Sequence, residues 1–376
     1  MRFREIKTLM EAARIQHAED VIFWEGSKGA MRVVNSLKSL EKNGHKDVTI
    51  KWDGSPAVIF GRMPDGQFVF TDKSGWSAKG YNGKTTSAEE VKNMFLSRSG
   101  GARREDPAQI EFANTMADLF NQFELIVPDN YTGFFKGDLL YSQTPQVVNN
   151  NFVFEPNIVE YAVDVQSELG QKIRQSNAGI VIHRMIDEQG NETPLQDYDI
   201  FTGNNVLVVP PISVESPAQK ISPALNKLEE LVTKNATLID ELLSPTELSM
   251  LKMTDFPKIL YRYINSKVDT GLDGLGIDFM DWLQTSNVSG VKQQRISDYI
   301  QKHGRAYAAM WKTVSSIMQV KDKIISQFEN QGGDIQQRIT GHTTNSGEGY
   351  VLAHPEGDIK LVPRATFSAA NRAVTR

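Results

Sequence analysis

The feature that most constrains the fold of this chain is the order of its strand-like and helix-like segments. From residue 48 to about residue 210, short apolar runs are separated by turn signals such as MPDG (63–66). From about residue 214 to 333, apolar residues recur with the 3.6-residue period of helices. Two strand-like runs return at 349–354 and 358–362. We therefore predict an α+β protein in which a helical insertion interrupts a β-rich domain.

Individual runs give the expected elements. The predicted strands of the first part are VTI (48–50), AVIF (57–60), QFVF (67–70), ELIV (124–127), GFFKGDLLY (133–141), FVF (152–154), IVEYAV (158–163), GIVIH (179–183) and VLVV (206–209). The predicted helices are 29–40, a polar stretch near 86–122, and then 222–232, 250–268, 279–284 and 293–327. We accordingly predict one domain from residues 1–212 and 340–376, and an all-α insertion domain over 213–339.

Composition excludes several functional classes. The chain has no cysteine, which excludes disulfides, thiolate zinc sites and cysteine nucleophiles. The net charge of -5 gives no overall basic field for nucleic acid, although an enzyme needs only a local basic cleft. No apolar run is long enough to span a membrane, and the mixed-charge residues 1–16 do not resemble a secretory signal. We expect a cytoplasmic protein with no membrane partner.

The sequence VTIKWDGSP (48–56) places Lys51 at the end of an apolar strand. Burying an ammonium group is costly, so the side chain either reaches water or takes part in chemistry. A lysine nucleophile must lose its proton, which requires partial desolvation, nearby cations or a metal ion. Attack on a nucleotide phosphate also requires positive charge on the phosphate oxygens and carboxylates for a divalent ion. Candidates for these roles are Lys73, Lys79, Lys84, Asp138, Glu348 and Lys360.

The tetrapeptide KWDG (51–54) resembles the K-x-D-G nucleotidyl-lysine motif of the superfamily that contains ATP-dependent DNA ligases, RNA ligases and mRNA-capping enzymes. This resemblance implies that Lys51 forms a covalent lysyl-AMP intermediate. It also implies that Ile50, Asp53 and Gly54 line the nucleotide site. The fold implied is a ligase-type nucleotidyltransferase domain of antiparallel sheets with flanking helices.

Further segments follow in the order of the family motifs. FKGDLLY (135–141) resembles the third motif, which implies that Asp138 holds the ribose hydroxyls. GEGYVL (347–352) resembles the fourth, which implies that Glu348 helps to hold the metal ion. DIKLV (358–362) resembles the fifth, which implies that Lys360 contacts the α-phosphate.

Two weaker matches and several departures complete the comparison. The position of GIVIH (179–183) suggests that His183 stacks on the base, and FTDKSG (70–75) suggests that Lys73 contacts the nucleotide. Pro56 stands where many DNA ligases have an arginine. The fifth motif lacks its second lysine, for which Arg364 is the candidate substitute. The resemblance covers roughly residues 45–210 and 345–365, so the helical insertion is outside it.

The resemblance implies an enzyme that uses ATP with Mg²⁺ or Mn²⁺ and seals 5′-phosphate to 3′-hydroxyl ends of nucleic acid. We expect no C-terminal OB domain, because only twelve residues follow Arg364, and this slightly favours RNA over DNA. The whole chain is similar to uncharacterised ligase-like proteins of large tailed bacteriophages, in which case the cytoplasm is that of an infected bacterium. The helical insertion is a candidate docking surface for a protein partner.

Two other functions fit the same residues. One is a catalytically inactive binding or structural phage protein on a ligase fold, and the other transfers a nucleotide to an acceptor that is not a nucleic acid. Each candidate also has an ordinary structural explanation: Lys51 as a strand-end lysine that reaches water, Glu348 as part of a turn, and Lys360 as a solvent-facing strand residue. The glycine-rich loop 76–84 suits base stacking and phosphate contact, but it also suits an ordinary surface loop.

Overall fold

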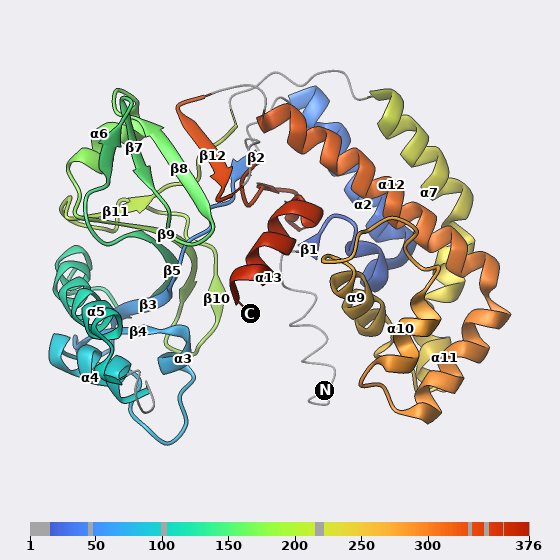
Figure 1. The fold of residues 1–376 in the computed structure, drawn as a ribbon, viewed down its shortest axis with the longest axis horizontal. Coiled ribbons are helices and arrows are strands. Elements are labelled where there is room, and N and C mark those ends of the chain that lie inside the picture. The colour runs from blue at the N-terminus through green and yellow to red at the C-terminus, as the bar shows by residue number, and fades with distance from the viewer. Residues whose placement is uncertain are drawn as a thin grey trace. The chain divides into compact units, whose positions relative to one another are not determined.

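The structure is a computed structural model, which describes residues 16–43, 48–98, 104–214, 222–329, 333–341, 346–355 and 357–375. The mixed-charge start of the chain, residues 1–15, lies outside this part. The chain forms two compact units, whose elements are labelled in Figure 1. Unit 1 comprises residues 1–51, 212–331 and 348–376, and unit 2 comprises residues 52–211 and 332–347.

Unit 1 is built mainly from helices. Its elements of this kind are α2 (Val21–Asn43), α7 (Ser222–Leu242), α8 (Pro245–Met250), α9 (Phe256–Ser266), α10 (Phe279–Thr285), α11 (Gly290–Lys302), α12 (Gly304–Glu329), the π-helix η3 (Arg364–Ser368) and α13 (Ala369–Thr375). Helix α7 packs against both α2 and α12. Its buried Leu225, Leu228 and Val232 recur every three or four residues, which confirms the predicted helical period. The helix predicted over 293–327 is divided into α11 and α12 at His303.

A four-stranded sheet completes unit 1. Its order is β1 (Gln16–His17), β14 (Ile359–Leu361), β13 (Tyr350–Leu352) and β2 (Val48–Ile50). Strand β1 runs parallel to β14, and the other pairs are antiparallel. Val48, Leu352 and Ile359 are neighbours in register, and all three belong to the hydrophobic core that the helices form.

This packing explains why the compact units differ from the predicted domain boundaries. Residues 1–51 and 348–376 were assigned to the β-rich domain, but their strands bury an apolar face against the helices and so belong to unit 1. That residues 1–212 and 340–376 form a nucleotidyltransferase domain, with 213–339 as a helical insertion domain, remains a prediction.

The larger sheet of unit 2 has the strand order β10 (Glu192–Thr193), β9 (Ala178–Ile186), β5 (Gly133–Tyr141), β3 (Ala57–Arg62) and β4 (Phe68–Asp72), with β11 (Val206–Val209) parallel to β9. Helices α4 (Ala88–Arg98) and α5 (Pro107–Ile126) pack against one face, where Phe60, Phe123 and Phe135 form an aromatic centre. The short helix α3 (Lys73–Trp76) follows β4 directly. The other face of β5 carries Lys136 and Asp138, because side chains alternate along a strand.

A second, antiparallel sheet of unit 2 has the order β12 (Ile335–Ile339), β8 (Val159–Asp164), β7 (Asn151–Phe154) and β6 (Gln146–Val148), and helix α6 (Glu168–Arg174) follows β8. Trp52 packs on it, with ring centroids 4.7 Å from Tyr161 and 6.3 Å from Phe154. Strand β12 carries polar side chains at most positions and was not predicted from the sequence.

One predicted strand is wrong. ELIV (124–127) forms the end of helix α5 and the residue after it. Phe123 and Ile126 are buried at helical spacing, whereas Leu125 between them is 66% exposed, so the run has the period of a helix and not of a strand. The α+β class with several antiparallel sheets is confirmed. Among the described residues, no helix has the length and apolar character that crossing a membrane requires.

Candidate active site

Lys51 meets Glu348 within unit 1. Strands β2 and β13 pair with Ile50 opposite Tyr350, and the Lys51 N–H donates to the Gly349 carbonyl at 2.9 Å. This register brings together two residues that are 297 positions apart, and their side chains form an ion pair. The Lys51 side chain is 21% exposed and that of Glu348 is 12% exposed. The strand-end lysine is therefore charge-compensated and only partly open to water.

Lys360 lies on the same small sheet. His17, Lys360, Val351 and Thr49 are neighbours in register across its four strands, so their side chains share one face. The apolar residues between them face the helices instead. The face that carries Lys360 thus has a cationic side chain near its centre and a histidine at its edge.

The sequence prediction missed His17 as a member of this face. Its pKa lies well below the usual value, first because the ring is buried and then because Arg364, Lys321, Lys360 and Lys51 place positive charge around it. The imidazole is therefore neutral near pH 7. Its Nδ1 atom is buried and has no hydrogen-bond partner among the residues that the structure describes. The sequence signal for it is HAED (17–20), in which two acidic residues closely follow the histidine.

Arg364 belongs to a buried group of four charges in unit 1. Its guanidinium donates to both Asp20 oxygens at 2.8 and 2.6 Å and lies 3.2 Å from Glu19. Lys321 donates to both Glu19 oxygens at 2.9 and 3.0 Å. All four side chains are almost completely buried.

Burial and ion pairing oppose each other in this group: burial outweighs the attraction of Arg364 at Asp20 and raises the pKa of that carboxyl, whereas pairing outweighs burial at Arg364 and Glu19. Burial lowers the pKa of Arg364, but the attraction of Asp20 and Glu19 outweighs burial and raises it overall. Burial raises the pKa of Glu19, but the charges of Lys321 and Arg364 outweigh burial and lower it. These ion pairs give Arg364 a structural part in unit 1, and its nucleotide-binding role as a substitute for the second lysine of the fifth motif remains a prediction.

Asp53 of the KWDG sequence is also held internally, in unit 2. Its carboxylate accepts hydrogen bonds from the Asn157 side chain and the Ile158 N–H, each at 3.0 Å. Its own N–H donates to the Tyr161 hydroxyl at 2.6 Å. Asp53 therefore fastens the segment after Lys51 to the start of strand β8.

Gly54 passes very close to strand β5. A Cβ atom at this position would lie 2.7 Å from the Asp138 Cβ and 2.9 Å from the Leu139 carbonyl oxygen. The Ser55 N–H then donates to the same carbonyl at 2.9 Å. The glycine of KWDG is thus required by its contact with the strand that carries Asp138.

We expect Gly54→Ala to lower the free energy of unfolding by about 1–3 kcal/mol, because the added methyl group would force β5 away. Urea denaturation followed by circular dichroism measures this change. Gly333→Ala is the matched control in the same unit, because no atom of the described part of the chain lies within 4 Å of a Cβ there. Equal stability of the two variants would contradict the close approach.

Asp138 and His183 form a pair on the open face of the larger sheet of unit 2. The Asp138 Oδ2 lies 2.8 Å from the His183 Nε2. In the pairing of β5 with β9, Lys136 opposes Arg184 and Gly137 opposes Ile182, which leaves His183 as the extra residue of a β-bulge. Bulges redirect side chains, and this one directs His183 to Asp138. The His183 side chain is 41% exposed.

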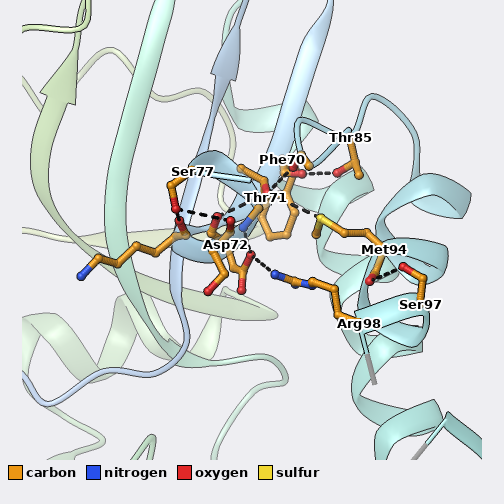
Figure 2. A network of polar contacts seen from close by, with 12 residues as sticks. Phe70, Thr71, Asp72, Ser77, Thr85, Met94, Ser97 and Arg98 are labelled. Atoms are coloured by element: carbon orange, nitrogen blue, oxygen red, sulfur yellow. Dashed lines mark hydrogen bonds and ion pairs between the residues drawn. The ribbon is translucent and has the colours of Figure 1, made fainter. Parts of the chain in front are cut away.

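Lys73 opens helix α3, and Figure 2 shows the network at the base of this helix. Asp72 caps the helix by accepting from the Gly75 N–H at 2.7 Å. The same carboxylate accepts from Arg98 at 2.8 Å. Lys73 itself is exposed.

The predicted residues thus fall into separate groups. Unit 1 brings Lys51, Glu348 and Lys360 onto one sheet, with Ile50 in its strand β2, but it places Arg364 in the buried charge group. Unit 2 brings Gly54 and His183 to Asp138. Asp53 precedes Gly54 and is hydrogen-bonded to the start of β8, and Lys73 lies on α3.

The donor set also indicates what kind of metal ion could bind. Among the described residues, no three histidine, aspartate or glutamate side chains gather as a metal-binding group. Mg²⁺ is commonly held by one or two carboxylates together with substrate phosphates. The single carboxylate of Glu348 therefore fits an ion that arrives with a nucleotide.

These features define an α+β protein with a partly buried lysine–glutamate pair at the end of a sheet strand. Residues 13–376 match the model of a family described as "Family of unknown function (DUF6267)", and the chain belongs to this family. Comparisons with curated proteins and with solved structures gave no match.

Proposed function

We propose that this protein is an ATP-dependent nucleotidyltransferase of the polynucleotide-ligase type, with Lys51 as its nucleophile. The observation that carries the proposal is the ion pair between Lys51 and Glu348 on the sheet that also carries Lys360. A reaction at a nucleotide α-phosphate needs an amine, a carboxylate for a metal ion and a fixed cation near one another. The three residue types come from sequence segments that resemble three family motifs in the same order.

In the proposed first step, the neutral Lys51 amine attacks the α-phosphorus of ATP. A phosphorus–nitrogen bond forms, the bond from the α-phosphorus to the oxygen that bridges to the β-phosphate breaks, and pyrophosphate leaves with that electron pair. The amine proton is released to solvent. The AMP group then passes to a 5′-phosphate end, and a 3′-hydroxyl displaces AMP to join the strands.

Each residue has a proposed part in these steps. Lys360 binds the α-phosphate oxygens and stabilises the charge that develops there. Glu348 would hold a divalent ion, which would withdraw charge from the phosphates. When nucleotide binding releases Lys51 from Glu348, the lysine ammonium loses a proton to solvent, and the neutral amine then attacks. In unit 2, the sequence resemblance gives Asp138 the role of binding the ribose hydroxyls and His183 that of stacking on the base, and the contact between the two side chains supports their acting together.

The test is incubation of the protein with α-labelled ATP and Mg²⁺ or Mn²⁺, followed by denaturation. We expect acid-labile label on the polypeptide and, by peptide mass spectrometry, an added AMP on Lys51. Treatment of the protein with pyrophosphate beforehand removes any AMP that is already bound. Absence of label with both metal ions after that treatment would refute the proposal.

One observation favours the alternative of an inactive ligase-fold binding protein. Val362 stands at the second lysine position of the fifth motif, and Arg364 is occupied by Asp20 and Glu19. A protein of this kind would bind ATP reversibly, and equilibrium dialysis would detect binding without covalent label.

A further inference from the structure

Residues 73–84 of unit 2 form a segment that we call the lysine loop, with the sequence KSGWSAKGYNGK. It carries Lys73, Lys79 and Lys84 and no acidic residue, in a chain whose net charge is -5. All three lysines are exposed. The loop is therefore a local positive surface on an acidic protein.

Strand β4 leads directly into the lysine loop, and hydrogen bonds attach the other end of the loop to the same strand (Figure 2). The Thr85 hydroxyl donates to the Phe70 carbonyl, and the Phe70 N–H donates to the Thr85 carbonyl at 3.1 Å. The Thr71 hydroxyl donates to the Gly83 carbonyl. These bonds hold the base of the loop in one geometry, so its lysines are presented from a fixed position and lose less freedom on binding.

Aromatic side chains lie among the lysines. The Lys84 ammonium is 4.2 Å from the centre of the Trp76 ring, and that ring packs edge-on against Phe134 at 4.8 Å. Tyr81 lies between Lys79 and Lys84 in the sequence and is 42% exposed. Tyr81 is thus an exposed aromatic residue between two exposed lysines, whereas Trp76 positions Lys84.

We propose that the lysine loop binds a single-stranded polynucleotide, with Lys79 and Lys84 on its phosphates and the Tyr81 ring stacked on a base. Exposed cations with an interleaved aromatic ring suit a single strand, because its phosphates are accessible and its bases present open faces. The phosphates and base faces are common to RNA and DNA, so binding does not depend on the sugar. The inference rests on the proposed function for its ligand, the strand whose end is joined.

The experiment measures binding of fluorescein-labelled 20-mers of oligo(U) and oligo(dT) by anisotropy, without ATP, across a range of salt. We expect both to bind with similar affinity. In the Lys79→Ala/Lys84→Ala variant, the slope of log K against log salt falls by about 1.4, because each lost phosphate contact removes about 0.7 for a single strand. Tyr81→Ala weakens binding roughly fivefold or more, and Tyr81→Phe keeps most of the affinity because the ring remains.

The matched control is Lys172→Ala/Arg174→Ala, which removes two exposed cations from α6 of the same unit. This variant is expected to keep the wild-type salt slope, and thermal unfolding checks that all variants fold. An unchanged slope in Lys79→Ala/Lys84→Ala, or equal binding of a 20-base-pair duplex, would overturn the inference. If AMP is attached covalently but no oligonucleotide binds, only the proposed role of the lysine loop is refuted. If the oligonucleotide binds but no AMP is attached, only the proposed activity is refuted.

Discussion

Lys51→Ala is expected to abolish covalent transfer of AMP to the protein, with at least a thousandfold loss of label. No other group can replace the amine that forms the phosphorus–nitrogen bond. Lys51→Arg is expected to be equally inactive, because a guanidinium stays protonated and cannot attack. The measurement is the initial rate of labelling from α-labelled ATP, with the fold of each variant checked by circular dichroism.

Lys38→Ala is the matched control for this experiment. Lys38 also forms an ion pair with a glutamate of unit 1, Glu229, and is likewise partly exposed. It is expected to label at the wild-type rate. If Lys51→Ala still carried AMP on another residue, the lysine at the end of β2 would have a structural role only.

Arg364→Met is expected to lower the free energy of unfolding by about 3–5 kcal/mol, because it leaves the buried carboxylates of Asp20 and Glu19 short of positive charge. Urea denaturation measures the loss. Lys302→Met is the control, because its ion pair with Glu247 is exposed, and pairs of that kind contribute about 1 kcal/mol or less.

A second substitution separates charge from packing. Asp20→Asn added to Arg364→Met removes the carboxylate that lost its partner, and part of the stability is expected to return. If Arg364→Met kept the wild-type stability and weakened only ATP binding, the phosphate contact that the sequence comparison suggested would replace the structural role.

Much of the fold could be predicted from local patterns. The run GFFKGDLLY coincides with β5, and the helical period over 222–232 lies within α7. The run ELIV failed because four apolar residues are too few to distinguish a strand from the end of a buried helix. Strand β1 has only two residues, which is too short for a periodic signal. Its partner β14 lies more than three hundred residues further along the chain, so the pairing leaves no local pattern either.

For the candidate site, the sequence predicted which residue types occur and in which order they follow along the chain, but not which of them are in contact. That Lys51 meets Glu348 depends on the pairing of β2 with β13, which no local pattern records. The ion pairs of Arg364 could not be predicted for the same reason, because its partners Asp20 and Glu19 lie more than three hundred residues earlier in the chain. Asp53 likewise accepts hydrogen bonds from Asn157 and Ile158, about a hundred residues further along the chain, at the start of β8.

The pairing of β2 with β13 has a consequence for how the protein is made. The ribosome adds Glu348 297 residues after Lys51, which takes roughly 15–60 s at about 5–20 residues per second. Throughout that time the lysine has been synthesised, but the strand that brings its carboxylate does not yet exist. If the proposed activity is right, a nascent or C-terminally truncated chain that lacks Glu348 and strands β13 and β14 cannot attach AMP to Lys51.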